Sequence, residues 1–198
     1  MAEGFWLTGA ILEAPGTAIA SSSTRTSLTV GSTQARWTLP ANALKRPGDT
    51  LILEATGIIT TVVTTPGTLT LDFALDTVAN CSTGAMTLNI VAQTNTPWYI
   101  RMPMSAFTVG AGTAAQLRFG GTWLSPASIN TALGATGPGP GGQIIPYSGT
   151  ATGASTLGAT FDSTVSHLTD FYSTFSVSTA NSIQLLTYSL TLITATGF

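Results

Sequence analysis

The chain has 198 residues, of which only 7% are charged, and its formal net charge at pH 7 is −2. An ordinary soluble domain carries about 25% charged residues, so this surface must consist mainly of Thr, Ser, Gly, Ala and amide groups. Such a surface suits a protein that packs against copies of itself or against another protein. The six basic residues are scattered, and nucleic acid is disfavoured as a partner because phosphate binding needs a clustered positive field.

The sequence also argues against disulfide-rich, membrane and secreted proteins. The single cysteine, Cys81, excludes an internal disulfide framework and any metal site made of cysteines alone. No run of about 18 or more apolar residues is present to cross a bilayer, so we expect no membrane partner. The first six residues carry Glu3 and no basic residue, from which we expect no secretory signal.

The N-terminal part is expected to be an extended arm. Its apolar residues, interrupted by glycine and proline, are Phe5, Trp6, Leu7, Ile11 and Leu12. A short strand is expected around residues 27–30. We therefore predict an arm with a first short strand over residues 1–37, followed by one β-sandwich domain over residues 38–198.

Turn residues and alternating patterns predict strands along the rest of the chain. Pro47-Gly48-Asp49 has the composition of a turn, and apolar residues alternate with polar ones from Leu51 onward. Gly57 interrupts this pattern, which predicts a bend or bulge. In residues 68–76, Leu69, Leu71, Phe73 and Leu75 are predicted to face a core, and Asp72 and Asp76 to face solvent. Residues 98–108 repeat the alternation, with Pro103 predicting an edge position or a bulge.

The C-terminal half combines a long loop with a long final strand. Residues 131–158 are rich in Gly, Pro, Ser and Thr and predict a loop. In the strand at 183–193, Leu186, Tyr188, Leu190 and Leu192 alternate with Ile183, Leu185 and Ile193. Because both faces are apolar, we expect this strand to be covered on both sides. The pattern as a whole predicts an all-β protein, an antiparallel β-sandwich of jelly-roll type with an N-terminal arm and a Gly/Pro-rich loop.

Residues suited to catalysis are few and do not form a known pattern. His167 is the only histidine, which excludes a site with several histidine ligands, and the nearby Ser163 lacks a G-x-S-x-G context. We expect His167 to lie at the surface or at a strand end. Residues 137–142 match G-x-G-x-x-G in letters, but their prolines and the missing helix argue against a nucleotide site. We expect no enzymatic activity, no cofactor and no metal.

Four stretches give the chain a likeness to a known class of protein: residues 39–57, residues 69–75, the strand at Trp98, and residues 161–186. In these the chain resembles virion proteins of tailed bacteriophages, of the jelly-roll type found as capsid decoration (cement) proteins, head fibres and tail-fibre modules. The resemblance implies a homotrimer without enzymatic activity, made in the host cytoplasm and located on the virion.

Three functions are considered, in order of preference. A capsid decoration protein would bind the major capsid protein as a trimer and stabilise the shell. Its apolar arm would reach a neighbouring subunit, and Leu186, Tyr188, Leu190 and Leu192 would line the trimer axis or the core. A fibre or tail module would instead bind a host glycan through exposed loops, with Trp123 and Tyr147 as candidate contacts. A glycan-cleaving enzyme would need a carboxylate pair, which the eight acidic residues do not obviously supply.

Overall fold

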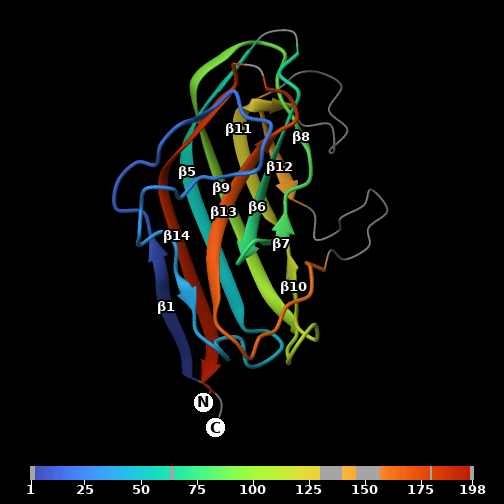
Figure 1. Ribbon diagram of the computed structural model, residues 1–198. Helices are drawn as coiled ribbons and strands as arrows, with labels where there is room; N and C mark the ends of the chain where they lie inside the picture. The colour runs from blue at the N-terminus through green and yellow to red at the C-terminus, as the bar shows by residue number, and fades with distance from the viewer. Residues whose placement is uncertain (1–2, 63–64, 130–139, 146–156, 179, 197–198) are drawn as a thin grey trace.

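The computed structural model describes residues 3–62, 65–129, 140–145, 157–178 and 180–196. In this part of the chain the regular structure is entirely β-strand, without a helix. The strands form two antiparallel sheets that pack together as a β-sandwich (Figure 1). The prediction of an all-β sandwich is therefore confirmed.

The larger sheet has eight strands, and β1 lies at one of its edges. From that edge the order is β1 (Glu3–Ile11), β14 (Ser182–Thr196), β5 (Thr50–Thr61), β9 (Gln93–Thr108), β11 (Gly121–Ile129) and β12 (Pro140–Ile145). Two short strands join this path, since β2 (Ile19–Ala20) pairs with β14 and β10 (Gln116–Phe119) pairs with β9. β12 falls inside the stretch predicted as a loop, and the rest of residues 131–156 lies outside the described residues.

The smaller sheet has six strands and packs over the centre of the larger one. Its order is β3 (Thr26–Ser27), β13 (His167–Phe175), β6 (Thr68–Leu75) and β7 (Val78–Ser82), with β4 (Thr38–Leu39) on β13 and β8 (Met86–Thr87) on β6. The predicted inward face of β6 is confirmed, because its three leucines and Phe73 are fully buried. In β9 the predicted face from Trp98 to Met104 is buried as well. Each such side chain contributes about 1.5–3 kcal/mol when it leaves water.

The predicted arm is wrong, because residues 3–11 form a regular strand. β1 pairs antiparallel with β14 from Glu3 opposite Thr196 to Ile11 opposite Ser189. β2 and β3 add residues 19–20 and 26–27 to the two sheets. Residues 3–37 are thus part of the sandwich, and position 37 does not separate two units. Local sequence does not predict this pairing, because the partner strand lies more than 170 positions away in the sequence.

The expectation that β14 is apolar and covered on both faces is also wrong. Leu185 lies opposite Gly57 and Thr187 lies opposite Thr56, so Leu186 is the extra residue of a β-bulge. The bulge moves Tyr188, Leu190 and Leu192 onto the same buried face as Leu185. These three side chains belong to the core of the protein's own sandwich and cannot line a trimer axis. The other face carries mainly threonine, serine and glutamine.

Pro103 lies within an interior strand, and the prediction of an edge or bulge needs correction. β9 pairs with β5 on one side, where Pro103 lies opposite Ile52. On its other side, β10 pairs with residues 104–108 and β11 with residues 99–101. The carbonyl of Pro103 accepts the N–H of Gly120 at this junction, at 3.3 Å. Pro103, which has no N–H to donate, therefore lies at the junction where β10 ends and β11 begins beside β9.

Candidate functional site

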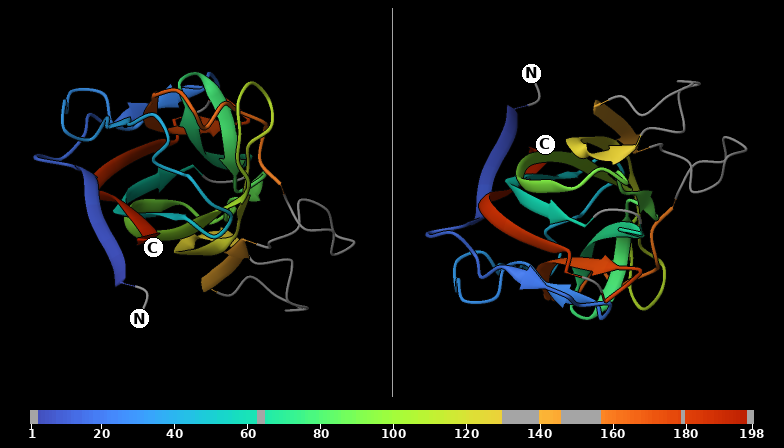
Figure 2. Two further views of the ribbon diagram at one scale, coloured as in Figure 1. Left: turned by 90° about the horizontal axis from the view of Figure 1, so that it is seen from below. Right: turned by 90° about the horizontal axis from the view of Figure 1, so that it is seen from above.

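The strand β1 carries the most exposed group of large apolar side chains on this edge of the protein. The exposed fractions are 49% for Phe5, 68% for Trp6, 38% for Leu7 and 46% for Ile11. Figure 2 shows this N-terminal strand, in blue, at the rim of the sandwich. Leu12, the fifth predicted contact residue, is half-buried and packs against the core. Four of the five predicted contact residues are thus brought together on one exposed strand.

The register places apolar side chains on both faces of β1. Leu7 lies opposite Leu192, and directly opposite residues share a face, so Leu7 and Phe5 are on the core side of the sheet. Leu192 is buried, whereas Phe5 and Leu7 remain exposed. The smaller sheet therefore covers β14 at this level but does not reach β1. Trp6, opposite Ile193, lies on the outer face.

A bulge at Gly9 limits the free part of the edge. Thr8 lies opposite Thr191 and Ala10 opposite Leu190, which leaves Gly9 as the extra residue. A side chain at position 9 would collide with the indole of Trp37, which lies on the glycine backbone. Beyond the bulge, the N–H of Ile11 donates to the carbonyl of Gln34 at 3.2 Å. Residues 3–8 therefore form the free edge, since within the described ranges they pair with β14 alone.

The free edge lacks the usual protection against association. Edge strands of natural sheets commonly carry lysine, proline or an inward-pointing charge. Between Phe5 and Ile11 the strand has none of these. A hollow of about 360 Å³ adjoins the upper part of β1, between Thr8–Ile11 and the segment from Gln34 to Thr38. From Phe5 to Ile11 the surface at this edge is thus uncharged, and it is bounded above by the Arg36 and Trp37 side chains.

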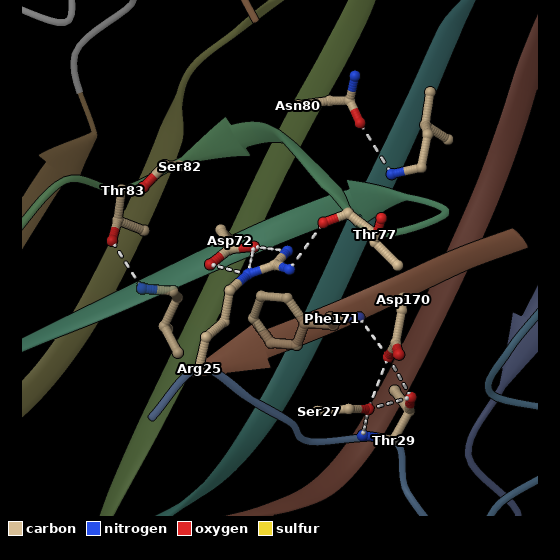
Figure 3. Close-up of polar contacts among 12 residues, drawn as sticks. Arg25, Ser27, Thr29, Asp72, Thr77, Asn80, Ser82, Thr83, Asp170 and Phe171 are labelled. Atoms are coloured by element: carbon tan, nitrogen blue, oxygen red, sulfur yellow. Dashed lines mark hydrogen bonds and ion pairs between the residues drawn. The ribbon is translucent and has the colours of Figure 1, made fainter. Parts of the chain in front are cut away.

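A buried polar cluster holds residues 25–36 on the outer face of the smaller sheet. Arg25 Nε donates to Asp72 Oδ1 at 2.9 Å (Figure 3), and its guanidinium lies 3.7 Å from the centre of the Tyr172 ring. Asp72 was predicted to face solvent, but it is 4% exposed because Arg25 lies across it. The cluster holds this segment in place.

Asp170 is the second carboxylate of this cluster and is 1% exposed. It accepts hydrogen bonds from Ser27 Oγ at 2.7 Å, Thr29 Oγ1 at 2.5 Å and the N–H of Phe171 at 2.8 Å (Figure 3). Arg36 Nη2 lies 2.6 Å from its other oxygen and neutralises the charge. All the groups that donate to Asp170 come from the protein itself. Asp170 therefore has a structural role in stabilising the fold.

His167 begins β13 and joins three segments of the chain. Its Nδ1 lies 2.7 Å from Asp76 Oδ2, and its Nε2 lies 2.5 Å from the backbone oxygen of Asp162. Carboxylates and carbonyls only accept hydrogen bonds, so a doubly protonated ring satisfies both contacts. Ser163, the nearby hydroxyl, is instead bonded to Gly110. The strand-end position is confirmed, the surface position is wrong, and the ring contacts no nucleophile in the described chain.

The predicted exposure of Trp123 is wrong. Trp123 lies in β11 and is fully buried, with its ring stacked on Trp98 at 5.4 Å between centroids. Its indole N–H donates to Ser128 Oγ at 2.9 Å. The glycines at 120–121 and Pro126 give the stretch a turn-like composition, and Thr122–Ser125 has no apolar–polar alternation that would indicate the strand. Tyr147 lies outside the described residues.

In the part of the chain that the structure covers, no group of three or more His, Cys, Asp or Glu side chains gathers to hold an ion. Cys81 is buried, and burial raises the pKa of its thiol well above the ordinary value. No helix among the described residues is long and apolar enough to cross a membrane.

Comparison with known proteins adds no assignment. No protein-family model matches the chain, and no curated protein is significantly similar to it. Function is therefore inferred from the residues and their arrangement. The exposed apolar side chains of edge strand β1 are a feature that the stability of the fold does not explain.

Proposed function

We propose that this protein is a non-enzymatic structural component of a tailed-phage virion, a decoration protein that binds the capsid surface and stabilises the shell. The observation that carries the proposal is the exposed apolar strand β1, which offers Phe5, Trp6 and Leu7 as a contact to a neighbouring subunit. An uncharged apolar patch of this kind is characteristic of an interaction surface. The resemblance to phage virion proteins supplies the setting, with the major capsid protein as partner.

The order of the strands supports the jelly-roll form of the sandwich. Four antiparallel pairs nest inside one another along the chain: β1 with β14, β3 with β13, β5 with β9, and β6 with β7. A long hairpin-like ribbon folded over on itself produces this nesting, and an eight-stranded jelly roll has that plan. β10, β11 and β12 lie between β9 and β13 in the chain and extend the larger sheet beyond β9.

The homotrimer rests on the resemblance alone. Of the four side chains expected to line its axis or the core, Tyr188, Leu190 and Leu192 lie in the core. A decoration protein with several copies per assembly would bind a lattice by many weak contacts, whose simultaneous engagement gives tight overall binding. Burying Trp6 and Leu7 would contribute about 1.5–3 kcal/mol each by transfer from water.

A glycan-binding fibre module is the less favoured alternative. Its main sequence support was an exposed Trp123, and that side chain is buried beneath the sheet surface. The decoration role depends on β1, whose exposed side chains lie on a regular strand and not in a flexible loop.

Substitutions that add charge to β1 test the proposal. Purified protein carrying Trp6→Lys or Leu7→Lys should stay folded but bind undecorated capsids at least tenfold more weakly than the wild type. Val78→Lys is the matched control, because Val78 on β7 is 49% exposed, between Leu7 and Trp6. Removing residues 1–12 is a poorer test, since it would uncover the edge of β14. Equal binding by all variants, or recovery of the protein from tails and not from capsids, would refute the decoration role.

A further inference from the structure

We infer that the free edge of β1 pairs with β1 of a second copy of this chain, antiparallel and about a two-fold axis. The two larger sheets would then continue into one another. This inference rests on the proposed role of β1 as a contact surface, and it names the occupant of that surface.

The two apolar faces of β1 select another strand as the partner. Phe5 and Leu7 are exposed on one face of the sheet and Trp6 on the other. A helix or a flat surface could cover only one of these faces. A strand placed in the plane of the sheet covers both, provided that its own side chains are apolar on both faces. β1 meets that condition itself, so two copies are complementary to each other.

Charge favours the antiparallel arrangement of the two strands. Glu3 is the single charged residue of β1 and stands at its beginning. A parallel pair would place the two Glu3 positions side by side, where like charges repel. An antiparallel pair centred on Trp6 places them at opposite ends. The net charge of only −2 per chain adds little repulsion between the copies.

The free edge is open to a second copy. The bulge at Gly9 and the bond from Ile11 to Gln34 restrict pairing to residues 3–8. Because the smaller sheet does not reach this part of β1, a second strand can approach in the plane of the sheet. In both views of Figure 2, β1 stands at the rim with β14 on its inner side. Each copy contributes about six residues, which is a short contact. Because of the two-fold axis, each interaction in this contact occurs twice.

The contact is expected to be weak in solution. Phe5 and Trp6 belong to the side chains that bury roughly 150–250 Å² each, while stable interfaces bury roughly 1,200–2,000 Å² in total. The four aromatic side chains of two copies therefore bury at most about 1,000 Å², which is below that range. On a lattice, several such contacts would act together, which raises their effective strength.

Cysteine cross-linking of the purified protein tests this inference. Single cysteines are introduced at positions 5, 6, 7 and 8, and the variants are oxidised alone and in mixed pairs. Directly opposite residues of an antiparallel pair have Cα atoms about 4.5–5.5 Å apart, within the range that a disulfide spans. Cys81 is buried and gives little background. We expect a product of two chains from at least one position or pair, and at least a tenfold lower yield from Leu124→Cys, an equally exposed position on β11.

The outcomes separate this inference from the decoration role. Absence of any two-chain product from β1, with the variants folded by circular dichroism, overturns self-pairing. Equal yields at β1 and at position 124 do the same, since they indicate random collision. Cross-links from β1 that form only to the capsid protein on virions overturn self-pairing and support decoration. Self-pairing in a protein that does not bind capsids would leave the inference standing and refute the decoration role.

Discussion

The indole ring of Trp98 lies against the backbone of Gly57, the residue directly opposite it in the neighbouring strand. A Cβ at position 57 would lie 2.5 Å from Trp98 Cζ2 and 2.0 Å from the backbone oxygen of Gln184. We therefore predict that Gly57→Ala lowers the free energy of unfolding by about 1–3 kcal/mol, the usual cost of overpacking. Urea denaturation followed by circular dichroism measures this.

The control for that substitution is Gly84→Ala. No atom lies within 4 Å of a Cβ at position 84, but its φ of +68° is unfavourable for alanine. A cost of about 1 kcal/mol is expected from the backbone alone. If Gly57→Ala costs no more than this control, the close packing of Trp98 on β5 is not a constraint.

Trp123 and Trp6 should differ widely in how much stability their substitution by alanine removes. Trp123→Ala removes a fully buried ring and should cost about 3–5 kcal/mol. Trp6→Ala removes a mostly exposed ring from the free edge and should cost under about 1 kcal/mol in the monomer. Thermal denaturation at low protein concentration distinguishes them. A large loss for Trp6 at that concentration would mean that β1 stabilises the monomer more than its exposure indicates.

Asp170 should be the carboxylate on which stability depends most. Asp170→Ala leaves Ser27 and Thr29 without their acceptor and Arg36 without its counter-ion. Arg36 is partly exposed, so the expected loss is about 2–3 kcal/mol, below that of a fully buried pair. Glu13→Ala, at an exposed position, should be neutral within about 0.5 kcal/mol. Similar midpoints for both variants in a urea titration would contradict the structural role of Asp170.

Acid should weaken the contact between Asp76 and His167. Partial burial raises the pKa of Asp76, but the hydrogen bonds from His167 and the N–H of Leu168 outweigh it and hold that pKa below its ordinary value. A lowered carboxyl pKa stabilises the fold above the unfolded-state pKa, near 4, and this contribution is lost as pH falls through the folded-state pKa. Asp76 is half exposed, so the effect is under about 1 kcal/mol.

The test for this contact compares the wild type with Asp76→Asn at pH 7 and at pH 3. The variant should be less stable at pH 7, and the difference should shrink at pH 3, where the wild-type carboxylate is also protonated. A constant difference between the two pH values would show that ionisation of Asp76 contributes nothing to stability.

The central strands could be predicted because their alternation is unbroken. Leu69 to Leu75 and Trp98 to Met104 have one buried face each, and a period of two identifies it directly. Bulges break this rule. In β14 the extra residue Leu186 reverses the alternation in mid-strand, so a regular reading assigns apolar residues to both faces. A bend or bulge was predicted at Gly57 in β5. Gly57 does lie opposite the bulge, but the extra residue, Leu186, is in the partner strand β14.

The residues of the candidate site could be predicted from the sequence, but the strand that they form could not. An exposed apolar segment at 5–11 followed from the sequence, whereas its pairing with β14 depends on a contact between the two ends of the chain. Local patterns contain no information about such distant partners. The same limitation applies to Asp72, since nothing in the sequence near it indicates that Arg25 covers it.

The position of β14 between β1 and β5 also determines when the chain can fold during its synthesis. A ribosome makes about 5–20 residues per second, and β1, β5 and β9 are complete well before residues 182–196 emerge. Until then β5 has a long, apolar and unpaired edge, and β1 has no partner at all. The nascent chain must therefore keep these edges apart for several seconds, and overexpression at lower temperature or with a holding chaperone should raise the soluble yield.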